Sequence, residues 1–192
     1  MDAPSNSPAP PSSGAPANVT LRIGHGYDLH RLAPMSIGEQ AGRPVRPLVI
    51  GGVPIEGPGV GGGSMGVLAH SDGDVLLHAV TDALLGALGL PDIGQLFPDH
   101  APENAGRASR DFVAEAARRV AEAGWSVANL DATVVLERPK LSPAKEAIRA
   151  NLAALLGVGI DRVNVKGKTH EGVDALGEGR AVEAHVVVLL TR

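Results

Sequence analysis

Two segments of the chain carry side chains of the kinds that bind metal ions. In GHGYDLH, residues 24–30, Asp28 and His30 stand two positions apart at the end of a segment rich in β-branched and aliphatic residues. On a strand, such a pair points to one face. Gly24 and Gly26 share that face and leave room for another group to approach. The motif therefore predicts a strand end that presents a carboxylate and an imidazole side by side.

The second segment is SDGDVLLHAVTDALLGALG, residues 71–89, a predicted helix that is apolar on most sides. Asp74, His78 and Asp82 recur at intervals of four, so they form one polar stripe along it. Charges on a buried helix are costly unless they are paired or bound to a metal. An ordinary alternative stays open: the aspartates are solvated, His78 is a hydrogen-bonded core residue, and the strand motif is a turn pair.

If the strand end meets this helix, Asp28, His30 and His78 form a metal site with two imidazoles and one carboxylate. Three protein ligands leave the fourth position of zinc open, as in catalytic sites. Asp82 is predicted to accept the other imidazole N–H of His78. His70 and Ser71 precede the same helix, where backbone N–H groups and the helix dipole favour an anion. A metal beside an anion site indicates phosphoryl chemistry.

Three further motifs contain polar side chains that fit this chemistry. PDIGQLFPD, residues 91–99, offers Asp92 and Asp99 as partners for hydroxyl groups, or as ordinary turn aspartates. In RPKLSP, residues 138–143, Lys140 stands just before a predicted helix start, where it could meet a phosphate. In KTHEG, residues 168–172, Glu171 could hold a hard cation such as Mg²⁺ together with substrate phosphates, or it is a surface glutamate.

The periodicity of the chain predicts the elements that position these motifs. Helices are expected at 71–89 with Ser71 or Asp72 as N-cap, from an N-cap at Ser109 to Gly124, and from an N-cap at Ser142 to Gly157. Strands are expected at 19–30, 126–137, 162–169 and 180–191, with short strands at 48–50 and 53–55. Residues 57–66 are expected to form a glycine-rich loop. This order predicts an α+β fold, a mixed four-stranded sheet with helices on one face.

The last strand predicts a second layer of contacts. Its sequence AVEAHVVVLL ends in a continuous apolar run, which is typical of a strand buried on both faces. One layer of helices covers only one face, so the other is expected to pack against another subunit.

Length and composition restrict the class of protein. The 192 residues allow one domain at 20–192, after a Pro/Ser/Ala-rich tail at 1–19 that is expected to be disordered. A net charge of -4 and 2% aromatic residues argue against nucleic acid as a partner. Because cysteine is absent, any transition metal must be held by nitrogen and oxygen. No long apolar run and no signal-like start is present, so a cytoplasmic protein that does not enter membranes is expected.

In order and spacing, several motifs resemble the 2-C-methyl-D-erythritol 2,4-cyclodiphosphate synthase family. They are GHGYDLHRL, LVIGGVPI, LAHSDGDVLLHAVTDALLGALGLPDIGQLFPD, RPKL and VNVKGKTHEG, within residues 21–191. The resemblance implies an isoprenoid-pathway lyase that converts 4-diphosphocytidyl-2-C-methyl-D-erythritol 2-phosphate to the cyclic diphosphate and CMP. It also implies a homotrimer with active sites between subunits, one Zn²⁺ per subunit, and Mg²⁺ or Mn²⁺ with the substrate diphosphate.

Residue by residue, the resemblance gives expected roles to this chain's side chains. It places the zinc ligands at Asp28, His30 and His78, and the second-metal ligand at Glu171. It gives Lys140 and Thr169 catalytic roles. Its substrate-binding residues are His70, Ser71, Asp92, Gly94, Pro139, Lys140, Leu141, Lys168 and Thr169, to which the loop at 91–99 adds Asp99 as a further expected substrate-binding residue.

The chain departs from the family pattern at several places. Ala101 stands where the family often has an aspartate, and GRAS at 106–109 stands where it has Gly-Ala-Asp-Ser. Lys168 replaces a threonine, and extra residues occur at about 35–44 and within 57–66. Two rival functions stay open. One is a phosphoesterase that uses water at the same metal site and yields a linear product. The other is a nucleotide-binding trimer without catalysis.

Overall fold

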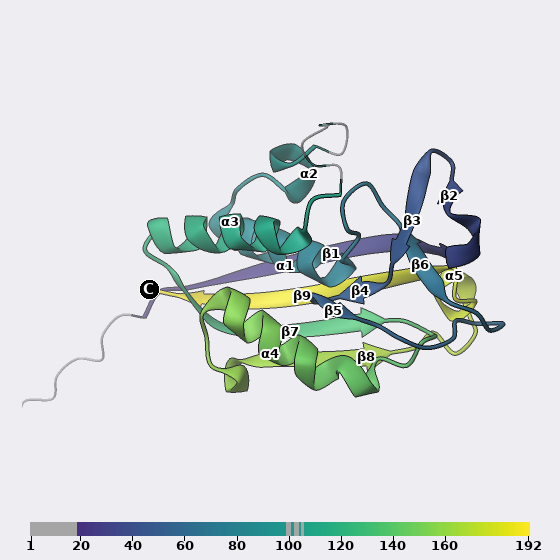
Figure 1. Ribbon diagram of the computed structural model, residues 1–192. Coiled ribbons are helices and arrows are strands. Elements are labelled where there is room, and N and C mark those ends of the chain that lie inside the picture. The colour runs from purple at the N-terminus through teal and green to yellow at the C-terminus, as the bar shows by residue number, and fades with distance from the viewer. Residues whose placement is uncertain (1–18, 99–100, 102–103, 105) are drawn as a thin grey trace, which may run out of the picture.

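The computed structural model describes residues 19–98, 101, 104 and 106–192. Its main sheet has seven strands in the order β2-β3-β6-β1-β9-β7-β8 (Figure 1). These strands are β1 (Leu21–Pro34), β2 (Glu39–Gln40), β3 (Arg43–Pro47), β6 (Met65–Leu68), β7 (Ser126–Val135), β8 (Val163–Lys168) and β9 (Ala181–Thr191). β7 and β8 run parallel and the other pairs are antiparallel, so the predicted mixed α+β fold is confirmed.

The prediction of four strands is wrong, because β1 is longer than the segment that pairs with β9. Residues 21–31 of β1 pair with β9, whereas Leu32–Pro34 pair with β6. β6 in turn pairs with β3, and β3 with β2. These three short strands lie within a glycine- and proline-rich part of the sequence whose alternation is too brief to read. A separate hairpin of β4 (Val49–Ile50) and β5 (Val53–Pro54) follows β3.

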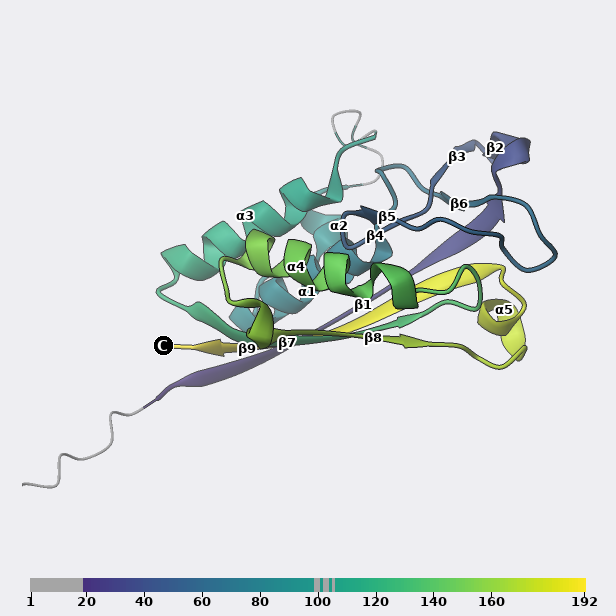
Figure 2. The ribbon, with the colours of Figure 1, turned by 60° about the horizontal axis from the view of Figure 1, so that its bottom comes forward.

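The helices lie on one face of the four long strands, as predicted, which Figure 2 shows for α1 (Val75–Leu88), α3 (Ser109–Glu122) and α4 (Lys145–Leu156). Short helices complete the chain: α2 (Ile93–Leu96), α5 (Asp174–Gly177) and the 3-10 turns η1 (Met35–Ile37), η3 (Ser142–Ala144) and η4 (Ile160–Arg162). Within the described segments, no helix combines the length and apolarity that a membrane crossing requires.

Helix α1 packs directly on the backbone of β1, and two glycines make this possible. A Cβ atom added to Gly24 would lie 1.8 Å from the Ala83 carbonyl oxygen, and one added to Gly26 would lie 1.8 Å from that of Ala79. No other residue fits such a contact. The group that approaches this face is therefore α1, and the contact brings the following residues of the strand, Asp28 and His30, to the start of the helix.

The start of α1 is fixed by Asp74, and the predicted N-caps Ser71 and Asp72 are wrong. The fully buried Asp74 carboxylate accepts N–H bonds from Leu76 and Leu77 and from Gly51 and Gly52 in the β4–β5 turn. Burial raises the pKa of Asp74 to about 6, although the backbone donors oppose that shift. Asp74 thus joins the helix to the hairpin instead of belonging to a polar stripe.

The two later helices also begin differently from the prediction. Ala108, not Ser109, is the N-cap of α3, and Ser109 is its first residue. Residues 142–144 form the 3-10 turn η3, so α4 proper begins at Lys145. The predicted end at Gly157 is confirmed, since Gly157 adopts the left-handed conformation (φ 66°) that ends a helix.

The outer face of the sheet carries exposed apolar side chains on β1 and β9 in the single chain. Its exposed side chains include Leu21, Ile23, Tyr27, Leu29 and Val187. Burial on both faces of the last strand is therefore not complete within one chain: Val187 is 45% exposed, while Val186 and Val188 are fully buried under the helices. An apolar patch of this kind is typical of a face that meets another protein surface.

Candidate metal centre

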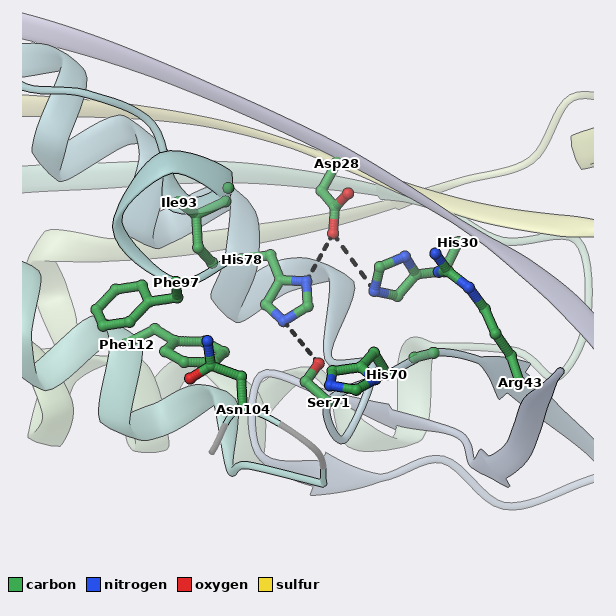
Figure 3. Close-up of a pocket in the computed structure, with 12 residues that line it drawn as sticks. Asp28, His30, Arg43, His70, Ser71, His78, Ile93, Phe97, Asn104 and Phe112 are labelled. Atoms are coloured by element: carbon green, nitrogen blue, oxygen red, sulfur yellow. Dashed lines mark hydrogen bonds and ion pairs between the residues drawn. The ribbon is translucent and has the colours of Figure 1, made fainter. Parts of the chain in front are cut away.

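Asp28, His30 and His78 come together where β1 meets the start of α1, as the sequence predicts (Figure 3). His78 Nδ1 lies 2.9 Å from Asp28 Oδ2, and His30 Nε2 lies 3.5 Å from the same oxygen. One donor atom from each residue lies within 4.8 Å of the other two. Donors bound to one zinc ion at about 2.0–2.2 Å must converge in this way.

The hydrogen bonds of His30 direct a nitrogen lone pair toward the centre. His30 Nδ1 lies 3.0 Å from the carbonyl oxygen of Leu29. A carbonyl oxygen only accepts, so Nδ1 carries the proton and Nε2, the atom near Asp28, is unprotonated in the neutral ring. An imidazole held in this tautomer by a backbone carbonyl is an arrangement typical of metal ligands.

His78 is oriented by a chain of side chains that sequence reasoning missed. Its Nε2 lies 2.8 Å from Ser109 Oγ, and the Ser109 hydroxyl donates to Asp72. Because the hydroxyl proton is directed to the carboxylate, the oxygen can accept the Nε2–H of His78. Nδ1 lies 2.9 Å from Asp28 Oδ2 and donates to that carboxylate; once it loses this proton, its lone pair is directed toward the centre. The sequence predicts Ser109 only as a helix cap, and the fold brings it to His78.

The prediction that Asp82 accepts an imidazole N–H of His78 is wrong. Asp82 Oδ1 accepts the backbone N–H of Ile93 instead, at 2.7 Å. Helical side chains lean toward the N-terminus of their helix, so the ring of His78 lies over the preceding turn and away from Asp82. Residues from the start of α3 and from the 71–74 turn occupy that side.

Electrostatic coupling ties the carboxylate and the imidazoles together. Burial disfavours the charged form of Asp28, but the hydrogen bond from His78 and the charge of His30 outweigh it and lower the pKa of the carboxyl. Burial likewise lowers the pKa of His78, but Asp28 outweighs it and raises that pKa. Asp28 is thus ionised at neutral pH and provides a negative charge where a cation would lie.

These residues fit a divalent transition metal. The donor set is two nitrogens and one oxygen, both imidazoles have hydrogen bonds that orient them, and His78 is buried. Two imidazoles with one carboxylate suit Zn²⁺, as well as other first-row metals that bind nitrogen and oxygen. Three ligands leave room for a ligand atom from the cavity.

A cavity of about 150 Å³ opens beside the metal centre. Of the predicted substrate residues it contains His70, Ser71 and Gly94. The Nε2 atom of His70 is buried without a hydrogen-bond partner among the described residues, so a bound ligand is expected to supply one. Six cavity residues were not predicted: Arg43, Ala69, Ile93, Phe97, Asn104 and Phe112. The rings of Phe97 and Phe112 lie 4.6 Å apart and form an apolar wall.

The remaining predicted residues lie elsewhere. Asp92 caps α2 by accepting the N–H of Gln95 at 2.9 Å and does not line the cavity, and Asp99 falls outside the described residues. Pro139, Lys140 and Leu141 follow β7, while Lys168, Thr169 and Glu171 stand at or just after the end of β8. The side chain of Leu141 is buried in the main core.

The metal ligands lie far from the predicted nucleotide residues on the same chain. Asp28 and His30 belong to β1, and β9 lies between β1 and the pair β7 and β8. At roughly 4.8 Å per strand spacing, β8 is about 14 Å from β1. The metal centre and the predicted nucleotide residues are therefore two separate groups of residues, the metal half-site and the predicted nucleotide half-site.

Comparison with known proteins identifies relatives over nearly the whole chain. The model of the YgbB family matches residues 21–191. The chloroplastic 2-C-methyl-D-erythritol 2,4-cyclodiphosphate synthase of Arabidopsis thaliana is 54% identical over 174 residues, covering 91% of this chain and 68% of that protein. The synthase of Rhodopirellula baltica is 49% identical over 177 residues, covering 92% and 97%.

Solved structures agree with these relatives. IspF of Plasmodium falciparum, in complex with CDP, is 34% identical with a TM-score of 0.72, covering 88% of this chain and 95% of that one. The bifunctional IspDF of Campylobacter jejuni is also 34% identical, with a TM-score of 0.79 over 91% of this chain. This chain spans only 43% of that longer protein.

Proposed function

The chain belongs to the YgbB family, and we infer that it is a 2-C-methyl-D-erythritol 2,4-cyclodiphosphate synthase of the isoprenoid precursor pathway. The substrate is 4-diphosphocytidyl-2-C-methyl-D-erythritol 2-phosphate and the products are the cyclic diphosphate and CMP. The observation on which this rests is the convergence of Asp28, His30 and His78 beside a cavity that contains His70 and Ser71.

The reaction is an intramolecular phosphoryl transfer. An oxygen of the 2-phosphate attacks the β-phosphorus, a new P–O bond closes the ring, and the bond from the β-phosphorus to the bridging oxygen breaks, releasing CMP. Such a transfer requires little covalent work from the protein, because positioning and neutralisation of charge supply most of the acceleration. A zinc ion held by Asp28, His30 and His78 would supply positive charge to a phosphate oxygen.

The side chains of the cavity hold the methylerythritol end of the substrate. His70 and Ser71 bind the 2-phosphate, consistent with the unsatisfied Nε2 of His70. Gly94, which lines the cavity, binds the erythritol hydroxyls together with Asp92 and Asp99 of the same segment of the sequence. The cavity is smaller than the roughly 300–1,000 Å³ that enclose drug-sized ligands, so the cytidine binds outside it.

The nucleotide end binds to the second half-site. Pro139, Lys140, Leu141, Lys168 and Thr169 contact the nucleotide, with Lys140 and Thr169 as the catalytic pair that neutralises the phosphates. Glu171 holds Mg²⁺ or Mn²⁺ on the diphosphate. In support, Lys140, Lys168 and Glu171 are exposed at one end of the sheet, where a ligand can reach them.

We propose that the chain forms a homotrimer with active sites between subunits, as the family resemblance implies. In this arrangement the metal half-site of one subunit pairs with the nucleotide half-site of its neighbour, and the separation of the two groups on one chain supports it. The exposed apolar face around Ile23, Tyr27 and Val187 is available for that assembly. Residues 20–192 form the single catalytic domain and 1–19 a tail. The cytoplasm is the proposed compartment, although the Arabidopsis relative is chloroplastic.

Release of CMP from the diphosphocytidyl substrate tests this function. We expect turnover by the metal-loaded protein, loss of turnover after treatment with a chelator, and recovery when Zn²⁺ is restored with Mg²⁺ present. Absence of CMP release from the fully loaded protein would contradict the assignment.

A further inference from the structure

The extra residues at about 35–44, for which the family resemblance implies no role, form η1 and most of the β2–β3 hairpin (Figure 1). Strands β2 and β3 pair through Gln40 and Arg43. The two residues between them, Ala41 and Gly42, have φ angles of 54° and 74°. Positive φ at both positions is typical of the tight type I′ turn of hairpins.

The hairpin is anchored to the main sheet. β3 pairs with β6 through Val45 and Leu68, and Val45 is buried against Ala33 and Leu68. The N–H of Val45 also donates to the carbonyl of Gly38 at 2.8 Å. The backbone of Arg43, two residues before Val45, is therefore held at a fixed place relative to the strands of the metal centre.

Arg43 is the side chain that this hairpin brings to the cavity. It lines the cavity together with Asp28, His30, His70 and Ser71. Figure 3 shows its guanidinium extending from β3 toward His30. The Arg43 side chain is exposed, so a ligand in the cavity can reach it. A guanidinium keeps its charge at every working pH and forms two parallel hydrogen bonds with a phosphate.

His70 gives independent evidence of an anion at this wall. Its Nε2 is buried without a partner among the described residues, in the same cavity as Arg43. The guanidinium of Arg43 and the imidazole of His70 both lie beside the metal centre, and together they can bind the oxygens of one phosphoryl group.

We propose that Arg43 binds a phosphoryl oxygen at the methylerythritol end of the substrate and so positions this end beside the metal centre. This role rests on the proposed function and extends it to a residue of the inserted hairpin. Arg43 belongs to the metal half-site, so it contributes to recognition of the methylerythritol phosphates and not of the cytidine.

The test compares Arg43→Ala and Arg43→Lys with the parent and with Arg162→Ala. Arg162 is an exposed arginine in η4, outside the metal cavity, and serves as the matched control. We expect Arg43→Ala to lower kcat/KM roughly 10- to 100-fold, since one charge-assisted contact to the substrate is lost. Arg43→Lys keeps the positive charge but cannot form two parallel hydrogen bonds with a phosphate. Its kcat/KM is therefore expected to lie between those of the parent and Arg43→Ala. Zinc content and Tm should stay at parent values.

Binding measurements by calorimetry separate this role from a structural one. The affinity for the cyclodiphosphate product should weaken in Arg43→Ala by a similar factor, while the affinity for CMP should not change. Parent-like kcat/KM and product affinity in Arg43→Ala would overturn the proposal, and so would an equal loss of CMP affinity, of zinc or of Tm. If the parent itself makes no cyclic product, the proposed function fails. Binding of inorganic pyrophosphate to the zinc-loaded parent and to Arg43→Ala then still decides the anion site: weaker binding supports it and equal binding overturns it.

Discussion

Ser109 Oγ lies 2.8 Å from His78 Nε2, on the side of the imidazole opposite to Asp28. The Ser109 hydroxyl in turn donates to Asp72, whose other carboxylate oxygen accepts the N–H of Ser109 at 2.8 Å. One residue at the start of α3 thereby fixes both the orientation and the tautomer of a proposed zinc ligand in α1.

Replacing Ser109 with alanine is expected to weaken zinc binding about 10- to 100-fold without abolishing it. Loss of a hydrogen-bond partner that orients a metal ligand has effects of this size. Competition with a chromogenic chelator measures the affinity. Ser142→Ala, at an exposed serine in η3, is the control. Equal affinities in the parent and Ser109→Ala would show that Ser109 serves only the packing of α3.

Removing a proposed ligand itself should have a larger effect. His30→Ala and His78→Ala are expected to lose zinc and cyclisation activity, because two protein ligands hold the ion far more weakly than three. Elemental analysis of the purified variants gives zinc per chain, and His170→Ala, at a histidine outside the metal centre, should retain it. A full complement of zinc in either ligand variant would exclude that residue as a ligand.

Asp74→Ala is expected to destabilise the protein by about 3–5 kcal/mol, although Asp74 is not a metal ligand. The substitution removes a helix cap and the acceptor of the Gly51 and Gly52 N–H groups, each loss costing roughly 1–3 kcal/mol. Denaturant unfolding measures the change. Asp74→Asn, which retains one acceptor oxygen, should lie between the parent and Asp74→Ala. Asp111→Ala, at an exposed carboxylate in the first turn of α3, should change stability by less than about 1 kcal/mol. A loss below 1 kcal/mol in Asp74→Ala would contradict the role given to this buried carboxylate.

Lys140→Ala should impair turnover of the nucleotide substrate without removing zinc. Its proposed partner is a phosphate, and loss of one charge-assisted hydrogen bond costs roughly 1.5–3 kcal/mol, or about 10- to 150-fold in kcat/KM. Steady-state kinetics and zinc analysis are measured on the same preparation, with Lys145→Ala in the first turn of α4 as control. An unchanged kcat/KM would show that Lys140 does not contact the substrate.

The metal ligands could be predicted because their spacing follows from local geometry. An Asp-x-His pair on a strand shares one face, and Gly24 and Gly26 mark where another element must approach. What the sequence could not supply are contacts between residues far apart in the chain. Ser109 reaches His78 across 31 positions, and only the packing of α3 on α1 brings them together.

Prediction from local sequence failed where several residues suit the same role and where strands are very short. Ser71, Asp72 and Asp74 all suit an N-cap, and the tertiary contact of Asp74 with Gly51 and Gly52 decides among them. The strands β2, β3 and β6 were missed because two to five residues show too little alternation. Arg43 was missed for the same reason, since its importance depends on the hairpin that brings it to the cavity.

Phosphorus NMR of the reaction product tests most directly that this metal centre serves ring closure. The protein, loaded with Zn²⁺ and Mg²⁺, is incubated with 4-diphosphocytidyl-2-C-methyl-D-erythritol 2-phosphate, and His78→Ala is treated in parallel. The account predicts that the parent gives CMP and two mutually coupled resonances of a cyclic diphosphate, and that His78→Ala leaves the substrate unchanged. A linear product with a free terminal phosphate, formed by attack of water, would contradict it.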